Sequence, residues 1–289
     1  MVVVGDLLLD LVAEVREPLA RGTDTGANIG ARAGGSSASV AVRLAGLGVE
    51  THFVGRVGRD VIGRFLAEDL ERRGVTHHLA EDPSLETGKV VVLVEADGER
   101  TMITDRGASG NLRPQDLPQD LFGAGRHLHL AGYGFSSEGS RDANFEALRR
   151  ACQAGMTVSV DPSSVAALEA IEPARFLEWT EGADILFPNL EEGALLADSR
   201  DPDAIVGTLR ERYPDVVLKL GPQGAVHASG DGEPLRLPAA PTEVADTTGA
   251  GDALCAGFLA AWLSGDAPAA ALQRGLDLAA RCVGEIGGR

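Results

Sequence analysis

A regular alternation of short apolar runs with longer helical segments constrains the fold of this chain more than any other feature. Runs rich in Val, Ile and Leu occur at residues 49–54, 75–79, 127–131, 156–160, 184–187 and 215–220. Helical patterns follow most of them, for example at residues 60–73 and 140–154. This rhythm predicts βαβ units, in which helices connect parallel strands. Because no linker-like stretch interrupts it, we expect residues 1–289 to form one doubly wound α/β domain, with a mostly parallel central sheet and helices on both faces.

Two segments break the alternation and predict a small β lid. Residues 11–33 mix Val, Ile and Leu with Gly, Arg and Asp without helical periodicity. Residues 88–107 hold two strand-like runs joined through Asp97-Gly98, a strong hairpin signal. Before the first segment, residues 1–9 read as a buried strand that ends at Asp10. The carboxyl ends of strands are where open α/β sheets bind ligands, although a solvated loop acid or a helix cap is the alternative for Asp10.

Charge and cysteine content exclude several classes of function. The chain has 26 Lys and Arg against 43 Asp and Glu, a formal net charge of −17, and no basic run, which argues against a nucleic-acid partner. Its three cysteines are widely spaced, so neither a disulfide framework nor a metal site is predicted. The N-terminus lacks the basic region of a signal peptide, and no apolar stretch reaches membrane-spanning length. We therefore expect a cytoplasmic protein without a membrane partner.

A glycine turn that opens an apolar helix predicts an anion site. Residues 246–252 read DTTGAGD, and the stretch that follows, 253–263, has almost no polar face. A helix that is apolar all round is normally buried, so its N-terminus should be fixed in the core with the turn facing a cleft. The unpaired N–H groups of such a turn and the positive end of the helix dipole bind phosphate.

Asp252 carries the argument from anion binding to chemistry. A carboxylate repels phosphate, unless it serves to take the proton from a hydroxyl that attacks the phosphoryl group. The alternative is a purely structural role: Asp252 stabilises the helix as an acidic residue in its first turn, and Thr247 or Thr248 caps the helix. A second glycine turn, Gly34-Gly35, precedes an Ala-rich amphipathic helix and gives a second helix N-terminus whose backbone is accessible.

Taken together, these motifs resemble the ribokinase-like (PfkB) family of carbohydrate and nucleoside kinases, over essentially the whole chain. The run 246–252 is the most specific part of the match. The resemblance implies that Asp252 is the catalytic base and that the amides of Gly249, Ala250 and Gly251 form the anion hole for the transferred phosphoryl group.

The resemblance also assigns a sugar site. It implies that the Gly34-Gly35 turn and its helix hold sugar hydroxyls and that Asp10 accepts two hydroxyl hydrogen bonds. Ser39 stands where family members usually carry Asn, and this shorter side chain removes an amide contact from the expected sugar geometry. Arg106 stands where relatives place an arginine near the substrate or the phosphates, with a solvated lid arginine as the alternative.

Three further motifs match the nucleotide side of the family. Asn189 and Glu192 fit the family's Asn-x-x-Glu, which implies that they hold Mg²⁺ around ATP through water. Lys219, in the run 219–224 (KLGPQG), resembles the start of the nucleotide-binding strand and turn and would reach the ATP phosphates; an exposed cation is the alternative.

Gly221 and Gly224 belong to the same nucleotide-binding turn. Asp246 completes the nucleotide set. Monovalent-cation (K⁺) activation, which occurs in relatives, would involve backbone near Asp246 and the end of the chain.

The predicted activity is in-line transfer of the ATP γ-phosphoryl group to a primary hydroxyl of a sugar or sugar-like molecule, with homodimerisation through the lid implied by the family. A nucleoside kinase would need aromatic stacking surfaces, and the lid segments contain no Trp, Tyr or Phe. Tyr133 and Phe135 near the cleft keep that alternative open. Ser39 leaves a second alternative, a catalytically silent ligand-binding or regulatory protein. A dehydrogenase is disfavoured because no Gly-x-Gly-x-x-Gly follows the first strand.

Overall fold

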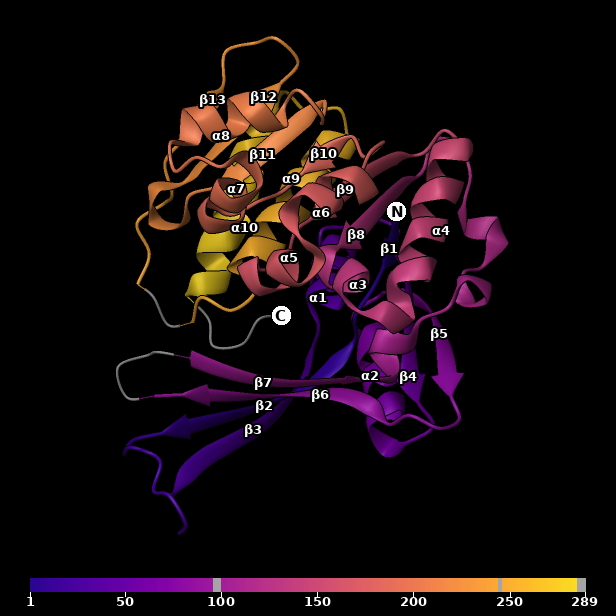
Figure 1. Cartoon of the computed structure of the whole chain (residues 1–289), viewed down its shortest axis with the longest axis vertical. Coiled ribbons are helices and arrows are strands. Elements are labelled where there is room, and N and C mark those ends of the chain that lie inside the picture. The colour runs from indigo at the N-terminus through magenta and orange to yellow at the C-terminus, as the bar shows by residue number, and fades with distance from the viewer. Residues whose placement is uncertain (96–99, 244–245, 285–289) are drawn as a thin grey trace.

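Two β-sheets organise the chain (Figure 1). The computed structural model describes residues 1–95, 100–243 and 246–284. Over these residues the larger sheet has nine strands, in the order β13 (Leu235–Leu237), β12 (Ala225–Ser229), β11 (Asp215–Lys219), β10 (Ile185–Leu186), β9 (Thr157–Asp161), β8 (His127–Ala131), β1 (Val2–Val4), β4 (His52–Gly58) and β5 (Thr76–Asp82). Neighbours from β11 to β5 run parallel, and β12 and β13 extend the sheet antiparallel. The predicted mostly parallel sheet is confirmed.

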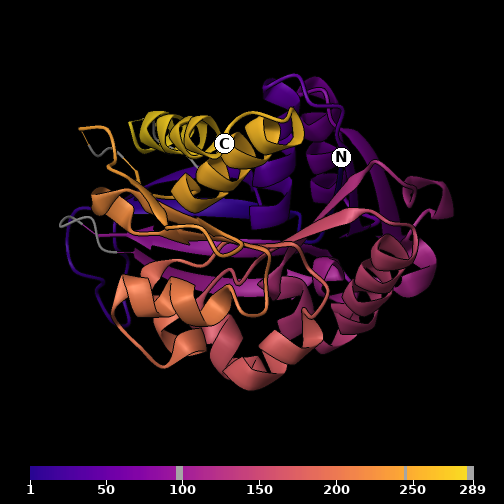
Figure 2. The same ribbon diagram turned by 90° about the horizontal axis from the view of Figure 1, so that it is seen from above.

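Helices cover both faces of this sheet, as Figure 2 shows from above. One layer consists of α1 (Ser36–Gly46), α2 (Val61–Arg72), α9 (Ala250–Leu263) and α10 (Pro268–Val283). The other consists of α3 (Gly132–Ser136), α4 (Glu138–Gln153), α5 (Val165–Ile171), α6 (Pro173–Trp179), α7 (Leu190–Ala197) and α8 (Pro202–Leu209). Side chains alternate between the two cores, so that Val3 packs with the first layer and Val2 and Val4 with the second. The fold is therefore doubly wound.

The second sheet projects from the main body and has the order β3 (Ala27–Gly34), β2 (Leu8–Val15), β6 (Thr87–Val94) and β7 (Arg100–Gly107). Its strands extend beyond the expected lid segments 11–33 and 88–107, because β2 begins at Leu8, β3 ends at Gly34 and β6 begins at Thr87. β6 and β7 pair antiparallel as predicted, while the Asp97-Gly98 turn lies outside the described residues. Alternate residues of each strand face the main body, because side chains in a strand point to opposite faces in turn.

The prediction of a first strand over residues 1–9 is wrong, because the strand is shorter and its carboxyl end lies earlier in the chain. The apolar run continues to Leu9, but β1 stops at Val4 and β2 begins at Leu8. Gly5 causes the break, because a Cβ there would lie 2.1 Å from Ser37 Oγ, so only glycine allows α1 to approach this turn. Asp6, not Asp10, therefore follows the carboxyl end of β1. Asp10 lies inside β2, on the second sheet.

The order in which the chain adds strands to the sheet reverses direction at β1, and this switch point indicates where a ligand crevice lies. β1 pairs with β4 on one side and with β8 on the other, so chain connections run outwards in both directions from it. Ligands of open α/β sheets bind at the carboxyl ends of the strands next to such a switch point. The second sheet and the N-termini of α1 and α9 meet at this same edge.

Candidate active site

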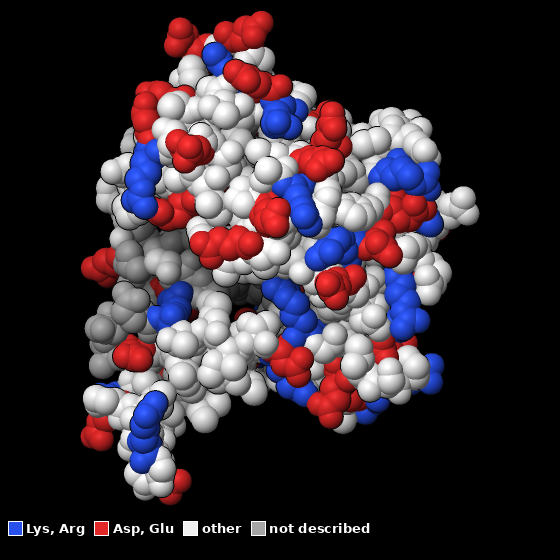
Figure 3. All heavy atoms as spheres, in the orientation of Figure 1, with Lys and Arg blue, Asp and Glu red and all other residues white. Residues whose placement is uncertain are grey.

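A large cavity opens between the main body and the second sheet. Its volume is about 1020 Å³. Figure 3 shows the surface hollowed between these two parts, with Lys and Arg side chains on the rim. The second sheet contributes alternate residues to its wall, among them Asp10, Val92, Thr104 and Arg106. The main body contributes the carboxyl ends of strands and the N-termini of helices.

The N-terminus of α1 is held by Asp6 across a glycine turn. Asp6 Oδ1 accepts a hydrogen bond from Ser37 N at 3.0 Å, and Oδ2 accepts one from Ser36 N at 3.2 Å. Gly35 has φ 102° and no side chain to cap the helix, and a Cβ there would lie 2.5 Å from the Asp6 carbonyl oxygen. The acid that follows β1 thus replaces the usual side-chain cap and fixes the direction of α1.

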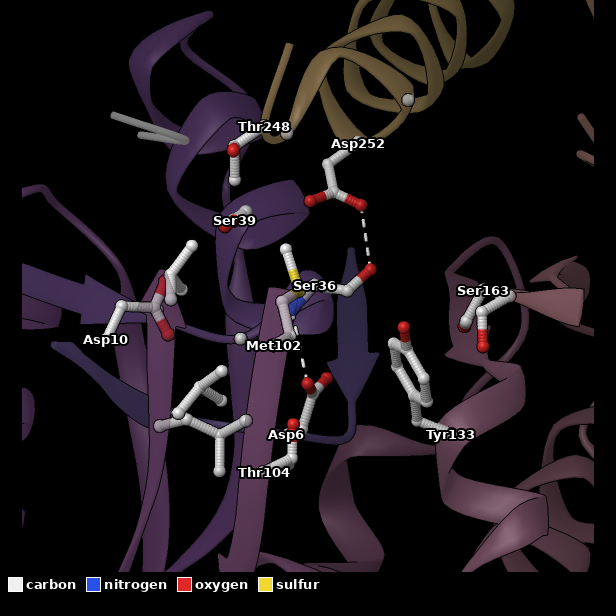
Figure 4. A pocket seen from close by; sticks show the side chains of 18 of the residues that line it. Asp6, Asp10, Ser36, Ser39, Met102, Thr104, Tyr133, Ser163, Thr248 and Asp252 are labelled. Carbon is white, nitrogen blue, oxygen red and sulfur yellow. Dashed lines mark hydrogen bonds between the residues drawn. The ribbon is translucent and has the colours of Figure 1, made fainter. Parts of the chain in front are cut away.

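Asp252 lies in the first turn of α9 and points at α1 (Figure 4). Ser36 Oγ donates a hydrogen bond to Asp252 Oδ1 at 2.7 Å. Gly249, at φ 74°, begins the helix without a side-chain cap. The Ala250 amide of the predicted anion hole donates to the Thr247 carbonyl oxygen at 3.3 Å, whereas Gly249 and Gly251 line the cavity. Residues 253–261 behind it are all buried, which confirms the expectation for this apolar helix.

The pKa of Asp252 suits a residue that accepts a proton near neutral pH. Burial raises the pKa of Asp252 to about 7, and the negative charge of Asp161 adds to the effect, while the hydrogen bond from Ser36 and the charge of Lys219 oppose it. A base works best when its pKa lies near the working pH. Asp252 is therefore divided between its acid and base forms near neutrality.

Lys219 supplies a cation beside the glycine turn. A Cβ at Gly251 would lie 3.4 Å from Lys219 Nζ, and Nζ forms an ion pair with Asp161 Oδ2 at 2.6 Å. Cys255 Sγ also donates to Asp161 Oδ2, at 3.2 Å. Burial disfavours the ammonium, but the Asp161 carboxylate outweighs it and keeps the pKa of Lys219 above its ordinary value. The lysine is thus charged and fixed in place, not solvent-exposed.

Asn189 and Glu192 form a capping box at the start of α7. Glu192 N donates to Asn189 Oδ1 at 2.9 Å, and Asn189 N donates to Glu192 Oε2 at 2.8 Å. Burial raises the pKa of Glu192 to about 7. The capping hydrogen bonds occupy one oxygen of each side chain. The pair is therefore better suited to hold Mg²⁺ through water molecules than to bind the ion directly. Mg²⁺ usually keeps several waters and binds substrate phosphates, and within the described residues no cluster of three or more His, Cys, Asp or Glu offers a metal site.

Two arginines of β7 reach the main body. Arg100 forms an ion pair with Asp246 Oδ1 at 2.5 Å and donates to Thr248 Oγ1 at 2.5 Å, which ties the second sheet to the glycine turn. Arg106 stacks over the Tyr133 ring, with its Cζ 4.3 Å from the ring centroid. Sequence reasoning singled out Arg106 and missed Arg100, although the two share one face of β7 at an even spacing.

Most of the predicted site residues line this one cavity. The lining includes Asp252, Gly249, Gly251, Asp10, Gly34, Gly35, Ser39, Arg106, Asn189, Glu192, Lys219, Gly221 and Asp246. Ala250 and Gly224 are not part of the lining. A Cβ at Gly224 would lie 2.0 Å from the Leu237 carbonyl oxygen, so this glycine serves the turn between β11 and β12.

Sequence reasoning also missed Asp6 and Ser36, and it misjudged an aromatic residue. The signal for Asp6 was its position directly after three valines, which the overlong strand concealed. Phe135 was expected near the cleft, but it is completely buried in the core against Phe145 and Phe176. Tyr133 does line the cavity.

The fold and the cavity together define a class: small-molecule kinases built on a doubly wound sheet, with a second sheet opposite the glycine turn before α9. Comparison with known proteins gives the family. A family model described as pfkB family carbohydrate kinase matches residues 1–289. The chain belongs to this PfkB family and is an ATP-dependent carbohydrate kinase. No helix in the described part of the chain has the length and apolar character needed to cross a membrane.

Individual relatives agree with this assignment. The chain is 36% identical over 259 residues to a fructokinase of Klebsiella pneumoniae, and the aligned stretch covers 86% of this chain and 83% of that protein. It superimposes on an adenosine kinase from Sinorhizobium meliloti with a TM-score of 0.90 at 26% identity, over 100% of this chain and 94% of the other. It also resembles an E. coli protein described as a ribokinase II, solved with ATP and Mg²⁺, with a TM-score of 0.87 at 26% identity, over 99% and 93% of the two chains.

Proposed function

We propose that this protein transfers the γ-phosphoryl group of ATP to a primary hydroxyl of a sugar or sugar-like substrate, with Asp252 as the general base. One observation supports this most directly. A buried carboxylate with a pKa of about 7 lies in the first turn of a helix whose N-terminus has no side-chain cap. Proton abstraction and anion binding are thereby available at one place, which phosphoryl transfer to an alcohol requires.

The residues of this chain have separate tasks in that transfer. Asp10 and the Gly34-Gly35 turn bind the sugar hydroxyls. Asp252 takes the proton of the attacking sugar hydroxyl. The hydroxyl oxygen forms a bond to the γ-phosphorus of ATP, and the bond from that phosphorus to the leaving oxygen of ADP breaks. The amides of Gly249 and Gly251, which line the cavity, stabilise the charge on the transferred group, whereas the Ala250 amide donates to the Thr247 carbonyl oxygen at 3.3 Å. Lys219, fixed by Asp161, adds a positive charge beside these amides.

Asn189 and Glu192 would hold Mg²⁺ through water at the nucleotide end, where the ion supplies charge neutralisation of the ATP phosphates. Gly221 lines the same cavity at φ 58°, a backbone conformation that leaves room for the nucleotide. Asp246 positions the glycine turn through its own carboxylate, which accepts a hydrogen bond from Thr248 N at 2.7 Å. The expected K⁺ site near Asp246 extends to the chain end, which falls partly outside the described residues.

The second sheet acts as a lid in this proposal. Closure over the sugar excludes water and limits wasteful ATP hydrolysis. We also propose that the lid mediates a homodimer through its outer face. Ile29 and Ile103 are 67% and 60% exposed there, and both lie on the face opposite Asp10 and Thr104.

The choice between a sugar and a nucleoside depends on the lid face. The part that lines the cavity is aliphatic around Val90, Val92 and Met102, and Tyr133 is already covered by Arg106. A nucleoside base therefore lacks an open aromatic surface in the lid, which favours a sugar. The remaining alternative, a silent binding protein, is disfavoured by the presence of Asp252 together with Lys219.

Turnover of ATP against a panel of sugars and nucleosides tests this proposal. We expect saturable, Mg²⁺-dependent ADP formation with sugars, abolished by EDTA, and a phosphorylated sugar detectable by mass spectrometry. Saturable turnover with nucleosides alone would overturn the sugar preference. Binding of sugar and nucleotide without any transfer would favour the silent binding protein.

A further inference from the structure

Arg32, on β3, has no role in the transfer described above. It lines the cavity, and its Nη1 is buried without a hydrogen-bond partner among the described residues. Within the same part of the chain its guanidinium forms no ion pair. A buried donor that is charged and unsatisfied is costly, so this side chain is positioned for a group that the protein itself does not provide.

Asp10 lies directly opposite Arg32 across the β2–β3 ladder. Opposite charges in such a position commonly pair, yet Arg32 Nη1 has no hydrogen-bond partner among the described residues. Asp10 turns instead over Gly34, where an added Cβ would lie 2.2 Å from Asp10 Oδ1. Figure 4 shows Asp10 directed towards the interior of the site. A carboxylate and a guanidinium thus both line the cavity.

The other cations of the cavity wall are already engaged by neighbouring side chains. Lys219 is paired with Asp161, Arg100 with Asp246, Arg72 and Arg73 with Asp69, and Arg106 is stacked on Tyr133. Arg32 differs from all of these, because among the described residues it has neither an acidic partner nor an aromatic one. Its charge is available to a ligand.

We propose that the acceptor sugar carries an acidic group, a carboxylate or a phosphate ester, which Arg32 binds while Asp10 binds the hydroxyls next to it. This inference rests on the proposed sugar kinase function and specifies its substrate class. A guanidinium binds both kinds of anion through two parallel hydrogen bonds. The chain as a whole carries a net charge of −17, so an acidic substrate needs such a local cation to offset repulsion. A neutral sugar offers Arg32 only uncharged hydroxyl acceptors, without a compensating charge or a bidentate acceptor.

Substitution of Arg32 tests the proposal through substrate preference. Wild type, Arg32→Gln and Arg32→Lys are compared with sugar acids, sugar phosphates and the parent neutral sugars, by steady-state kinetics and by calorimetry without ATP. Arg16→Gln is the matched control, since Arg16 is exposed in the segment that follows β2 and loses the same charge. Circular dichroism verifies that each variant folds.

We expect wild type to prefer acidic sugars, and the ratio of kcat/KM for the acidic over the neutral sugar to fall about 10- to 100-fold in Arg32→Gln, mainly through KM. Arg32→Lys restores part of the ratio, and Arg16→Gln keeps it. Whether sugar acids or sugar phosphates are preferred identifies the kind of anion. An unchanged ratio in Arg32→Gln, or equal efficiency of wild type with neutral sugars, overturns the inference while leaving the kinase function standing. Failure of wild type to phosphorylate any sugar contradicts the proposed function instead, and calorimetric affinity for acidic sugars still reports on Arg32.

Discussion

At the scale of single residues, Asp252 shows how catalysis and stability oppose each other. Its carboxylate is buried near Asp161 and Asp6, and both raise its pKa in addition to burial. Ser36 moderates this shift most, because its hydroxyl stabilises the ionised form, and the charge of Lys219 adds to the effect. The pKa of the base therefore depends strongly on one hydroxyl group supplied by another helix.

Removal of that hydroxyl should move the pH dependence of the reaction. Wild-type kcat/KM should fall as pH drops below about 7, because protonated Asp252 cannot accept a proton. Ser36→Ala removes the hydrogen bond that lowers the pKa of Asp252, so the acid limb of the profile should shift to higher pH. Profiles measured between about pH 5 and 9 reveal the shift. The exposed Ser229→Ala serves as control, and a Ser36→Ala profile that coincides with wild type would contradict the assignment.

Neutralisation of the same carboxylate should stabilise the fold. The pKa of Asp252 is about 7 in the folded state and about 3.9 in an unfolded chain. The folded state therefore loses stability as pH rises from about 4 to 7, and the loss is complete above pH 7. Asp252→Asn should raise the free energy of unfolding by up to about 4 kcal/mol at pH 8 and by less at pH 5.

Urea unfolding at both pH values measures this difference. Asp142→Asn, an exposed acid on α4, should change stability little at either pH. A gain for Asp252→Asn that is equal at the two pH values would mean that the shifted carboxyl is not the cause.

At the scale of elements, the contact between β7 and the glycine turn joins the two sheets. Arg100 is 19% exposed and its partner Asp246 13% exposed, so the ion pair is largely shielded from solvent. Arg100 also bonds the hydroxyl groups of Thr247 and Thr248. One side chain therefore links the lid strand to the N-terminal side of α9.

Loss of this link should loosen both elements together. Arg100→Gln should speed amide hydrogen exchange about tenfold in β7 and in residues 246–252, because a partly buried charged hydrogen bond is lost. Exchange measured by mass spectrometry on wild type, Arg100→Gln and the exposed control Arg64→Gln tests this. Faster exchange in β7 alone would show that the two elements are not coupled.

The elements themselves were largely predictable from the sequence, and their junctions were not. Periodicity identified the strand 127–131 with its observed bounds, and the helix 60–73 to within one residue at each end, since their patterns are local. The break between β1 and β2 was missed because Leu7, Leu8 and Leu9 continue the apolar run, although they serve a buried turn and a second sheet. Arg100 was missed because its significance depends on Asp246, far away in the chain, and Arg32 because its significance depends on its place in the cavity wall; no local pattern records either.

At the scale of the whole molecule, the lid presents two different faces. The face towards the cavity combines Asp10, Arg32 and aliphatic side chains. The opposite face carries Ile29 and Ile103, both exposed, on the two edge strands β3 and β7 of the same sheet. Exposed apolar side chains on a sheet favour association with a second surface.

Association of two lids should be sensitive to charge on this outer face. We expect the wild-type protein to sediment as a dimer. The Ile103→Asp variant should sediment as a monomer, because burial of a carboxylate at an apolar interface is unfavourable. Sedimentation velocity at matched protein concentrations measures the change, with the exposed Val61→Asp on α2 as control. A wild-type monomer would refute dimerisation through the lid.

The central claim is that Asp252 takes the proton from the acceptor hydroxyl. The most direct measurement is single-turnover transfer from ATP to the sugar substrate by wild type and Asp252→Asn, with the affinities for both ligands determined separately by calorimetry. We predict that transfer slows by about 10²- to 10⁴-fold while both affinities change only a few-fold. Transfer by Asp252→Asn at close to the wild-type rate would contradict this account.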